Sequence, residues 1–402
     1  MRLLVVLNRP PFPPRSGSTI VAHNILRCLS PRHETSFLCL QGADDPAGAQ
    51  GYLRTAAYAR EQPPTDFLRR WRRRLGKARG IPSIVSDAHS DALAALVRKF
   101  LEENACDAIL LFGLDALQYC PPAWHHRVAV FVEDPPSLKL ARLAELPVWT
   151  PWERFSLSAT ELVTRRYERR VLPRMGKVLL LSEADRSDMQ ALDGDTNLGV
   201  VPYGVTTTPD DPLPGYEERT EGMIVFSGNM FHPPNVDGAL HFLRTAFPLL
   251  LPRSPSARLW IVGADPDPRI RAEAARFGDR VVTTGRVDAV SDYLRRARVS
   301  ICPVRLKIGC QTKVLEAMAC GTPVVTTSAG NSGVSGESGR ELWAADAPEE
   351  FAGRIAGLLR GEGWTRLSGA GRRFTEEHRS WERCTAALET LLETVAAGGA
   401  TP

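Results

Sequence analysis

Short apolar segments alternate along the chain with longer amphipathic ones. In the first half, the apolar segments predict strands at residues 3–7, 35–40, 108–112, 128–132 and 178–181. Residues 23–29 and 86–101 instead place their apolar side chains at helical spacing. Strands that alternate with helices are typical of a parallel sheet, so the pattern predicts an α/β fold.

A second series of the same kind follows a polar segment rich in proline. Its strands are predicted at residues 223–227, 258–262, 281–283, 299–303 and 324–327. We therefore expect an N-terminal Rossmann-like domain at 1–205, a linker at 206–222 and a C-terminal Rossmann-like domain at 223–375. Parallel sheets bind ligands beyond the carboxyl ends of their strands, and two such sheets facing one another would form a cleft.

Composition agrees with two globular domains. The 402 residues exceed the usual size of one core, and 43% are hydrophobic against 24% charged. A net charge of +4 is too small to indicate nucleic-acid binding. The eight cysteines are scattered without a Cys-x-x-Cys pair, which favours reduced thiols and a cytoplasmic location. The first apolar segment is too short for a signal peptide or a membrane span.

Two segments concentrate basic residues. Residues 69–79 hold seven lysines and arginines around Trp71 and Leu75, and residues 165–170 hold four arginines. Solvated helix faces are one interpretation of both segments. The alternative is contact with anionic lipid at the inner face of a membrane, or with a phosphorylated or lipid-linked acceptor.

The segment 305–325 carries the clearest chemistry. Gly309 loosens a loop, Thr312 is a candidate N-cap, and Gly321 with Pro323 ends the helix between them. The amides at a helix N-terminus suit a diphosphate, and Lys313 adds a full positive charge there. Glu316, three residues later, projects from nearly the same face and can accept hydrogen bonds from ribose hydroxyls. A surface ion pair between the two side chains is the alternative.

Residues 313–325 resemble the donor-binding motif of the retaining GT-B glycosyltransferases of family 4, also called group 1. Residues 226–230, 234–237 and 285–287 are similar to exosortase-associated sugar transferases of bacterial exopolysaccharide clusters. The resemblance implies the GT-B fold, in which two Rossmann-like domains with parallel sheets face one another across a cleft. It also implies that a helix at about 376–395 packs back on the first domain.

The same resemblance implies roles for particular residues. It assigns Glu316 to the ribose and Lys313 to the diphosphate and sugar. The rest of the implied donor site comprises Ser16, Gly17, Ser18, Gly228, Asn229, Arg286, Val287, Gly309, Cys310, Gln311 and Thr312. Arg286 and Val287 would flank the base, and the loop at Ser16 to Ser18 would approach the donor phosphate.

Two positions depart from the family pattern. Ile308 stands where many members have the first of two glutamates, and Asn229 with a following proline pair stands where many have an arginine and a lysine. Arg305 or Lys307 would have to supply the missing charge. Asp265-Pro266-Asp267 is the nearest approach to a metal-binding Asp-x-Asp and fits a turn, so we expect metal-independent chemistry without a cofactor.

The second catalytic candidate besides Lys313 is Asp134. It follows a predicted strand, where a carboxylate can position the acceptor hydroxyl or the donor sugar; a helix N-cap is the alternative, and the neighbouring Glu133 is the less favoured carboxylate.

Together these observations predict a hexosyltransferase. A sugar would pass, with retention implied by the resemblance, from a nucleotide-diphosphate sugar, with UDP favoured, to an acceptor hydroxyl in polysaccharide or glycoconjugate biosynthesis. The alternatives are a glycosyltransferase that tailors a small-molecule metabolite, a sugar-nucleotide epimerase, and a relative that binds the nucleotide sugar without turnover.

Overall fold

The computed structural model describes residues 1–14, 17–40, 55–59, 75–76, 79–193, 197–207, 212–307 and 309–398. The chain divides into two compact units. Unit 1 comprises Met1–Ala141, Glu153–Pro202 and the segment from Trp381 onward, and unit 2 comprises Arg142–Trp152 and Tyr203–Ser380. Each unit is an α/β domain built on one parallel sheet.

The sheet of unit 1 has the strand order β3-β2-β1-β4-β5-β6-β7, and neighbouring strands pair in parallel. Its central strands consist almost entirely of Val, Leu, Ile and Phe, and these side chains are buried. Such strands are typical of a parallel sheet with helices on both faces. The strands are β1 (Arg2–Leu7), β2 (Glu34–Leu40), β3 (Thr55–Ala59), β4 (Ala108–Phe112), β5 (Val128–Glu133), β6 (Lys177–Leu180) and β7 (Leu198–Val200). The helices are α1 (Gly17–Leu29), α3 (Ser83–Ser86), α4 (Asp91–Glu103), α5 (Pro136–Ala144), α6 (Pro151–Val171), α7 (Glu183–Asp193) and α16 (Trp381–Gly398), with 3-10 helices at Leu114–Tyr119, Pro122–Arg127 and Leu172–Arg174.

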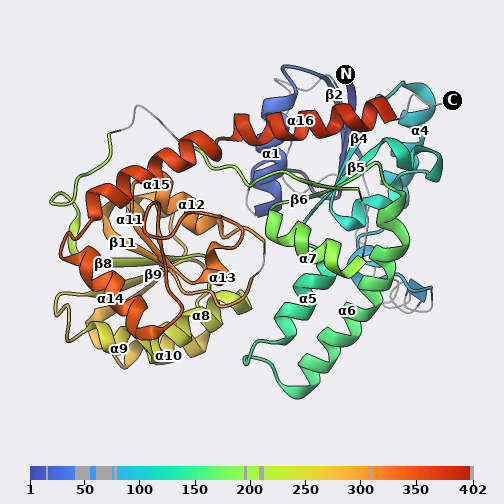
Figure 1. The fold of residues 1–402 in the computed structure, drawn as a ribbon. Coiled ribbons are helices and arrows are strands. Elements are labelled where there is room, and N and C mark those ends of the chain that lie inside the picture. The colour runs from blue at the N-terminus through green and yellow to red at the C-terminus, as the bar shows by residue number, and fades with distance from the viewer. Residues whose placement is uncertain are drawn as a thin grey trace. The chain divides into compact units, whose positions relative to one another are not determined.

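Helix α16 belongs to unit 1 although it follows unit 2 in the sequence. It lies beside α1 (Figure 1). Glu389 of α16 accepts hydrogen bonds from Arg32 at 2.6 Å and from the ring of His33 at 2.8 Å. A Cβ atom on Gly199 would come within 2.9 Å of Leu391, so the helix packs closely on β7 as well.

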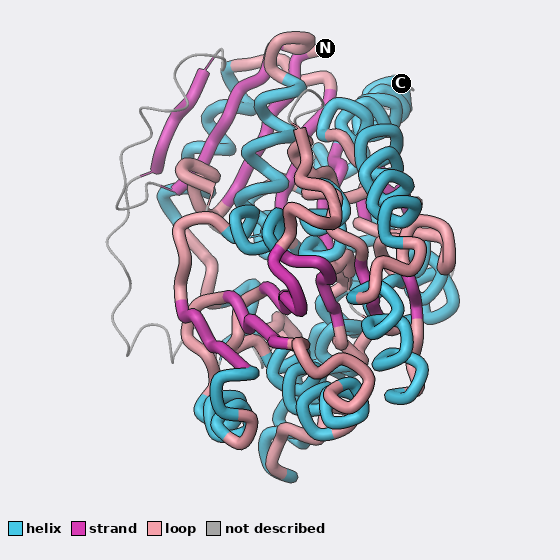
Figure 2. Tube along the Cα trace, turned by 90° about the vertical axis from the view of Figure 1, so that its left-hand side faces the viewer, coloured by secondary structure: helices cyan, strands magenta, loops and turns pink. Residues whose placement is uncertain are grey.

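The sheet of unit 2 has the order β10-β9-β8-β11-β12-β13 and is also parallel. Figure 2 shows the strands between helices. The strands are β8 (Thr220–Ser227), β9 (Arg258–Val262), β10 (Val281–Gly285), β11 (Ala297–Cys302), β12 (Val324–Thr326) and β13 (Trp343–Ala344). The helices are α8 (Pro233–Arg244), α9 (Ala246–Leu250), α10 (Pro268–Ala275), α11 (Val290–Arg296), α12 (Thr312–Ala319), α13 (Ser328–Asn331), α14 (Pro348–Leu359) and α15 (Trp364–His378), with a 3-10 helix at Gly278–Arg280.

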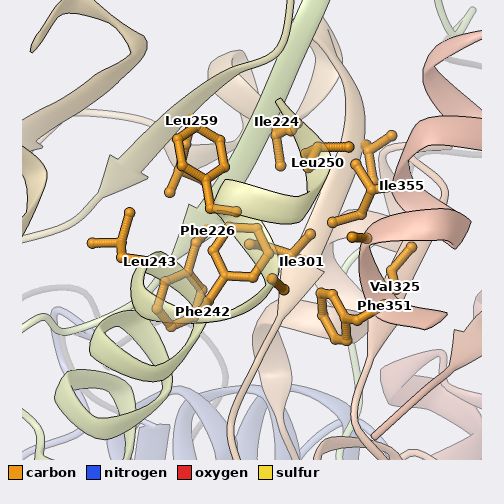
Figure 3. Packing of buried hydrophobic residues seen from close by; sticks show 14 of the residues in the cluster. Ile224, Phe226, Phe242, Leu243, Leu250, Leu259, Ile301, Val325, Phe351 and Ile355 are labelled. Carbon is orange, nitrogen blue, oxygen red and sulfur yellow. The ribbon is translucent and has the colours of Figure 1, made fainter. Parts of the chain in front are cut away.

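The core of unit 2 lies between its sheet and the helices α8, α9 and α14. Phe226 of β8, Phe242 of α8 and Phe351 of α14 meet there, together with Ile301 and Leu243 (Figure 3). Each such side chain contributes about 1.5–3 kcal/mol when it is fully buried. This core fixes β8 and β11, whose carboxyl ends lead into the loops described below.

Arg219 anchors the end of α12 from inside unit 2. Its side chain is buried and donates hydrogen bonds to the carbonyls of Cys320 at 3.0 Å and Gly321 at 3.1 Å, and to the hydroxyl of Thr322 at 2.8 Å. Its guanidinium also lies over the ring of Trp364. Burial lowers the pKa of Arg219 to about 10, so the side chain stays charged at neutral pH.

Each strand predicted from the sequence overlaps an observed strand, and the short strands β3, β7 and β13 were not predicted. Three boundaries need correction. The segment predicted as helical at 86–101 is divided, because α3 ends at Ser86 and α4 begins at Asp91 with Ser90 as its N-cap. Helix α1 begins at Gly17, six residues before the predicted start, because the first residues of the helix are polar and exposed. Thr312 is the first residue of α12, and the N-cap is Gln311, whose side chain makes no capping hydrogen bond.

The basic segment 69–79 lies largely outside the described residues, which include only Leu75, Gly76 and Arg79 of it. Residues 165–170 belong to α6. Across the described ranges, no helix combines the length and the apolar character needed to cross a membrane. All eight cysteines are free thiols.

Candidate functional site

The carboxyl edge of the unit 2 sheet carries glycines at the ends of three adjacent strands. Gly228, Gly263 and Gly285 have φ of 145°, 155° and 72°. A Cβ atom on Gly263 would lie 1.7 Å from the carbonyl oxygen of Gly228, so only glycine fits there. The loops after β8 and β9 therefore approach one another closely, and no side chain from these glycines fills the space above the strands.

Lys313 reaches this glycine edge from α12. Its Cε atom would lie 3.1 Å from a Cβ atom on Gly228, and its Nζ donates to Oε1 of Gln311 at 2.7 Å. Asn235 of α8 packs against Gly228 too and donates to the carbonyl of Asn229 at 2.8 Å. The structure thus brings together Gly228, Asn229, Gln311 and Lys313, which the sequence predicted as parts of one site.

The charge of Lys313 has a neutral partner. Within the described ranges its hydrogen bond goes to the Gln311 amide, and no ion pair neutralises it. The first amides of α12 have no side-chain cap, so the positive end of the helix dipole lies next to this ammonium group. An uncompensated lysine beside uncapped amides is an arrangement that attracts an anion.

Glu316 lies one turn further along α12 and is half-buried. Burial raises the pKa of its carboxyl group, and the positive charge of Lys313 offsets part of that rise. A carboxylate in this position can accept hydrogen bonds from neighbouring hydroxyl groups. The backbone before the helix is fixed as well, because a Cβ atom on Gly333 would lie 2.0 Å from the carbonyl oxygen of Gly309.

Arg305 forms an ion pair with Asp237, which the sequence did not predict. Its Nε and Nη2 donate to the two carboxylate oxygens of the buried Asp237 at 2.9 Å and 2.7 Å. Arg305 lines a pocket of about 200 Å³ together with His241, Phe242 and Phe351. Because Asp237 neutralises Arg305, this arginine is a weaker replacement for the missing basic residues than the sequence suggested.

Arg286 and Val287 follow β10 at the end of the same sheet edge. Arg286 is exposed and Val287 is half-buried. The order β10-β9-β8 places them beyond β9, on the far side from α12. Arg286 and Val287 thus lie at the predicted edge of the sheet, but they are not neighbours of Lys313.

The carboxyl edge of the unit 1 sheet carries acidic and amide side chains instead. Asn8 follows β1 and donates a short hydrogen bond to the carboxylate of Asp115, which follows β4. Burial raises the pKa of Asp115. Ser18, in the first turn of α1, donates to Oε2 of Glu133 at 2.9 Å. We call Asn8, Ser18, Asp115 and Glu133 the unit 1 edge cluster; Asn8 and Asp115 had no signal in the sequence beyond following predicted strands.

Glu133 and Asp134 have different surroundings although they are adjacent. Glu133 has a φ of 62°, a backbone conformation that non-glycine residues adopt rarely and that often marks functional sites. Burial raises the pKa of its carboxyl group to about 7. Asp134 instead forms an ion pair with Lys139 at 3.2 Å. The structure therefore favours Glu133, the carboxylate that the sequence analysis ranked second, as the more perturbed group.

The remaining residues of the first loop give a mixed picture. Ser16 lies outside the described residues. Gly17 opens α1, and a Cβ atom there would meet nothing within 4 Å, so crowding does not require glycine at this position. Of this loop, Ser18 is the residue that contacts the unit 1 edge cluster.

Two α/β units, each built on one parallel sheet, match the architecture of the GT-B fold. The chain superimposes on a sucrose-phosphate synthase from Thermosynechococcus elongatus with a TM-score of 0.71, at 16% identity over 98% of this chain and 99% of the other. It also matches Anabaena HepE, solved in complex with UDP and glucose, with a TM-score of 0.64, at 14% identity over 98% and 99% of the two chains.

Residues 221–361, within unit 2, match the family described as glycosyl transferases group 1. A phosphatidyl-myo-inositol mannosyltransferase from Mycolicibacterium smegmatis is 26% identical over 279 residues, which are 66% of this chain and 70% of the relative. Unit 2 is therefore similar to glycosyl transferases of group 1, and the structural matches confirm the predicted fold of two parallel-sheet α/β units.

Proposed function

We propose that this protein transfers a hexose from a nucleotide-diphosphate sugar, with UDP as the favoured nucleotide, to an acceptor hydroxyl. The observation that carries the proposal is Lys313, which forms no ion pair among the described residues and lies beside helix amides without a side-chain cap and beside a glycine edge. Retention of configuration, independence from metal ions and a cytoplasmic location in polysaccharide or glycoconjugate biosynthesis are parts of this proposal.

The chemistry follows from where charge develops. When the glycosidic bond breaks, the electron pair goes to the diphosphate oxygen, so the leaving group gains negative charge. Lys313 and the first amides of α12 stabilise that charge. Glu316, one turn away, holds the ribose hydroxyls and so fixes the nucleotide relative to Lys313.

Relatives support the choice of a nucleotide sugar. Anabaena HepE was solved with UDP and glucose, and a Staphylococcus aureus TarM mutant with UDP, at TM-scores of 0.64 and 0.55. The mannosyltransferase and the sucrose-phosphate synthase are named for sugar chemistry too. The names differ in sugar and acceptor, so the proposal specifies neither.

The unit 1 edge cluster supplies the groups that we propose for the acceptor. Glu133, held by Ser18, can accept a hydrogen bond from the acceptor hydroxyl when it is ionised. Asp134 remains the second candidate and differs in being paired with Lys139.

A thermal-shift screen tests the donor assignment. The protein is heated with UDP, GDP, dTDP, CDP and their common sugars, because a ligand that binds the folded state raises the melting temperature. We expect one nucleotide to give a clear shift that Glu316→Ala abolishes. Lys99→Ala, an exposed lysine of α4, is the matched surface control.

The outcome with the chosen donor then tests the reaction. The anomeric configuration of the product, followed by NMR, checks retention, and unchanged turnover in EDTA checks metal independence. No shift with any nucleotide would contradict the proposal and favour a protein that has lost the donor site.

A further inference from the structure

Helix α6 presents an apolar stripe to solvent. Trp152, Phe155 and Leu162 are 75%, 63% and 46% exposed. With Ala159 they follow one another at intervals of three and four residues, which places them on one face of the helix. Large exposed side chains scattered singly are ordinary, but three along one helix face form a patch.

The stripe continues with arginines. Arg166 and Arg169 extend the same spacing and are exposed, and Arg169 also donates a hydrogen bond to the carbonyl of Leu192 at 2.7 Å. The stripe therefore consists of Trp152, Phe155, Ala159, Leu162, Arg166 and Arg169, and we call it the α6 stripe. From Trp152 to Arg169 it is about 25 Å long at the rise of an α-helix.

The glutamates of α6 lie off this stripe. Glu161 pairs with Arg165 at 2.7 Å, and Glu168 is buried where it accepts a hydrogen bond from the amide of Ser137 at 3.1 Å. Glu153 follows Trp152 directly and so points about 100° away from it around the helix. The face thus joins apolar and positive side chains without a carboxylate between them.

The first part of α6 buries no side chain completely. The buried residues of this helix are Thr164, Tyr167 and Glu168, from its fourteenth position onward, whereas Leu157 and Val163 are half-buried. Helices in proteins gain most of their stability by packing an apolar face, so the residues before Thr164 gain less from packing than the last two turns do. The exposed aromatic residues of this part are the ones that a partner would cover. Figure 1 shows α6 as the long helix next to α5.

We propose that the α6 stripe binds the surface of an anionic lipid bilayer, with the helix lying in the plane of the interface. Tryptophan and phenylalanine would enter the boundary between head groups and acyl chains, and Arg166 and Arg169 would meet the lipid phosphates. We choose an anionic bilayer as the partner because it matches both ends of the stripe. The basic end requires an anionic partner, and the apolar end requires a hydrophobic one.

Vesicle co-sedimentation tests the proposal with the full chain. We expect binding to vesicles that contain about one third anionic phospholipid, weak binding to zwitterionic vesicles, and release in high salt. Phe155→Glu with Leu162→Glu should lower the partition coefficient at least tenfold. Arg166→Gln should lower it about fivefold at low salt.

The matched control is Ile84→Glu with Leu249→Glu. These side chains are 51% and 37% exposed, lie outside α6 and introduce the same two charges. The control should bind vesicles like the wild type. Equal losses in both double variants, or no binding by the wild type, would overturn the proposal. A dimer that forms without lipid and that dissociates in the variant Phe155→Glu with Leu162→Glu would also overturn the proposal, because a second copy of the chain would then cover the stripe.

The proposal does not depend on sugar transfer. The shift in melting temperature caused by UDP, measured on the same variants without vesicles, should equal that of the wild type. Variants that lose vesicle binding but keep the UDP shift would show that α6 binds lipid independently of the donor site. A wild-type protein that binds vesicles but shows no UDP shift would contradict the proposed donor site and leave the lipid proposal intact.

Discussion

The two sheets end in edges of opposite character. The unit 2 edge has glycines after β8, β9 and β10 and one lysine whose hydrogen bond goes to an amide. The unit 1 edge has Asp115 and Glu133, both with raised pKa values, held by Asn8 and Ser18. The same parallel-strand architecture therefore supports an edge suited to anions in unit 2 and an edge of carboxyl groups with raised pKa values in unit 1.

One fold thus carries two edges with different residues, and the chemistry that we propose for each edge follows from those residues. Backbone amides and a single positively charged side chain suit a diphosphate, because the diphosphate is negatively charged. Carboxyl groups can accept hydrogen bonds from a hydroxyl group or donate them to it, depending on their protonation. Four changes test this contrast, from the largest expected effect to the smallest.

Lys313→Ala should have the largest effect. It removes the full charge that we propose for the leaving group, and the loss of such a stabilising group lowers turnover by about 10²–10³-fold. Turnover of the UDP-sugar measures the effect, with Lys99→Ala as the control. A Lys313→Ala variant that keeps most of its turnover would show that the unit 2 edge does not stabilise the diphosphate.

Gly263→Ala should come next, because it tests whether backbone crowding shapes the unit 2 edge. The new Cβ atom would meet the carbonyl of Gly228 at 1.7 Å, so we expect a loss of about 3 kcal/mol or more in unfolding free energy. Gly285→Ala is the matched control, since its φ is positive but nothing lies within 4 Å of its Cβ position. It should cost about 1 kcal/mol. Urea unfolding compares them, and equal losses would mean that only the backbone angle matters.

Glu133→Gln should change how stability depends on pH. The folded-state pKa of about 7 lies above the ordinary value of 4.5, so the folded protein keeps a proton that the unfolded chain releases. The wild type should therefore lose about 2–3 kcal/mol as the pH rises from about 4.5 to 7, and the variant should not. Urea midpoints at pH 5, 6, 7 and 8 measure this. Parallel profiles for the two proteins would place Glu133 in an ordinary solvated setting.

Asp134→Asn should have the smallest effect on stability. Its pair with Lys139 is partly exposed, and such pairs contribute about 0–1 kcal/mol. If Glu133 is the group that handles the acceptor, turnover should fall less in Asp134→Asn than in Glu133→Gln, measured at pH 8. The reverse order would return the role to Asp134.

Much of the fold could be predicted because its signals are local. The strands are short apolar segments between helices, and Gly321 with Pro323 ends α12 where the sequence predicts it. Lys313 and Glu316 could be paired for the same reason, since helical spacing places them on neighbouring turns. Short strands such as β13, with two residues, escape detection because two residues carry no period.

The side-chain partners could not be predicted because they join distant parts of the chain. Arg305 meets Asp237 across 68 positions, and Ser18 meets Glu133 across 115. The raised pKa of Glu133 comes from burial, which only the assembled sheet creates. Sequence spacing therefore identified the candidate residues of the unit 2 edge and gave no basis for ranking Glu133 above Asp134.

The position of α16 has a consequence for biosynthesis. The body of unit 1 is synthesised once Pro202 is added, yet the helix that covers α1 and β7 begins at Trp381. At elongation rates of about 5–20 residues per second, the intervening residues take roughly 10 to 40 s to translate. During that interval the surface that later receives Leu388 and Leu392 faces the cytosol of the producing cell, and a chaperone that shields apolar surface would be most useful to the nascent chain then.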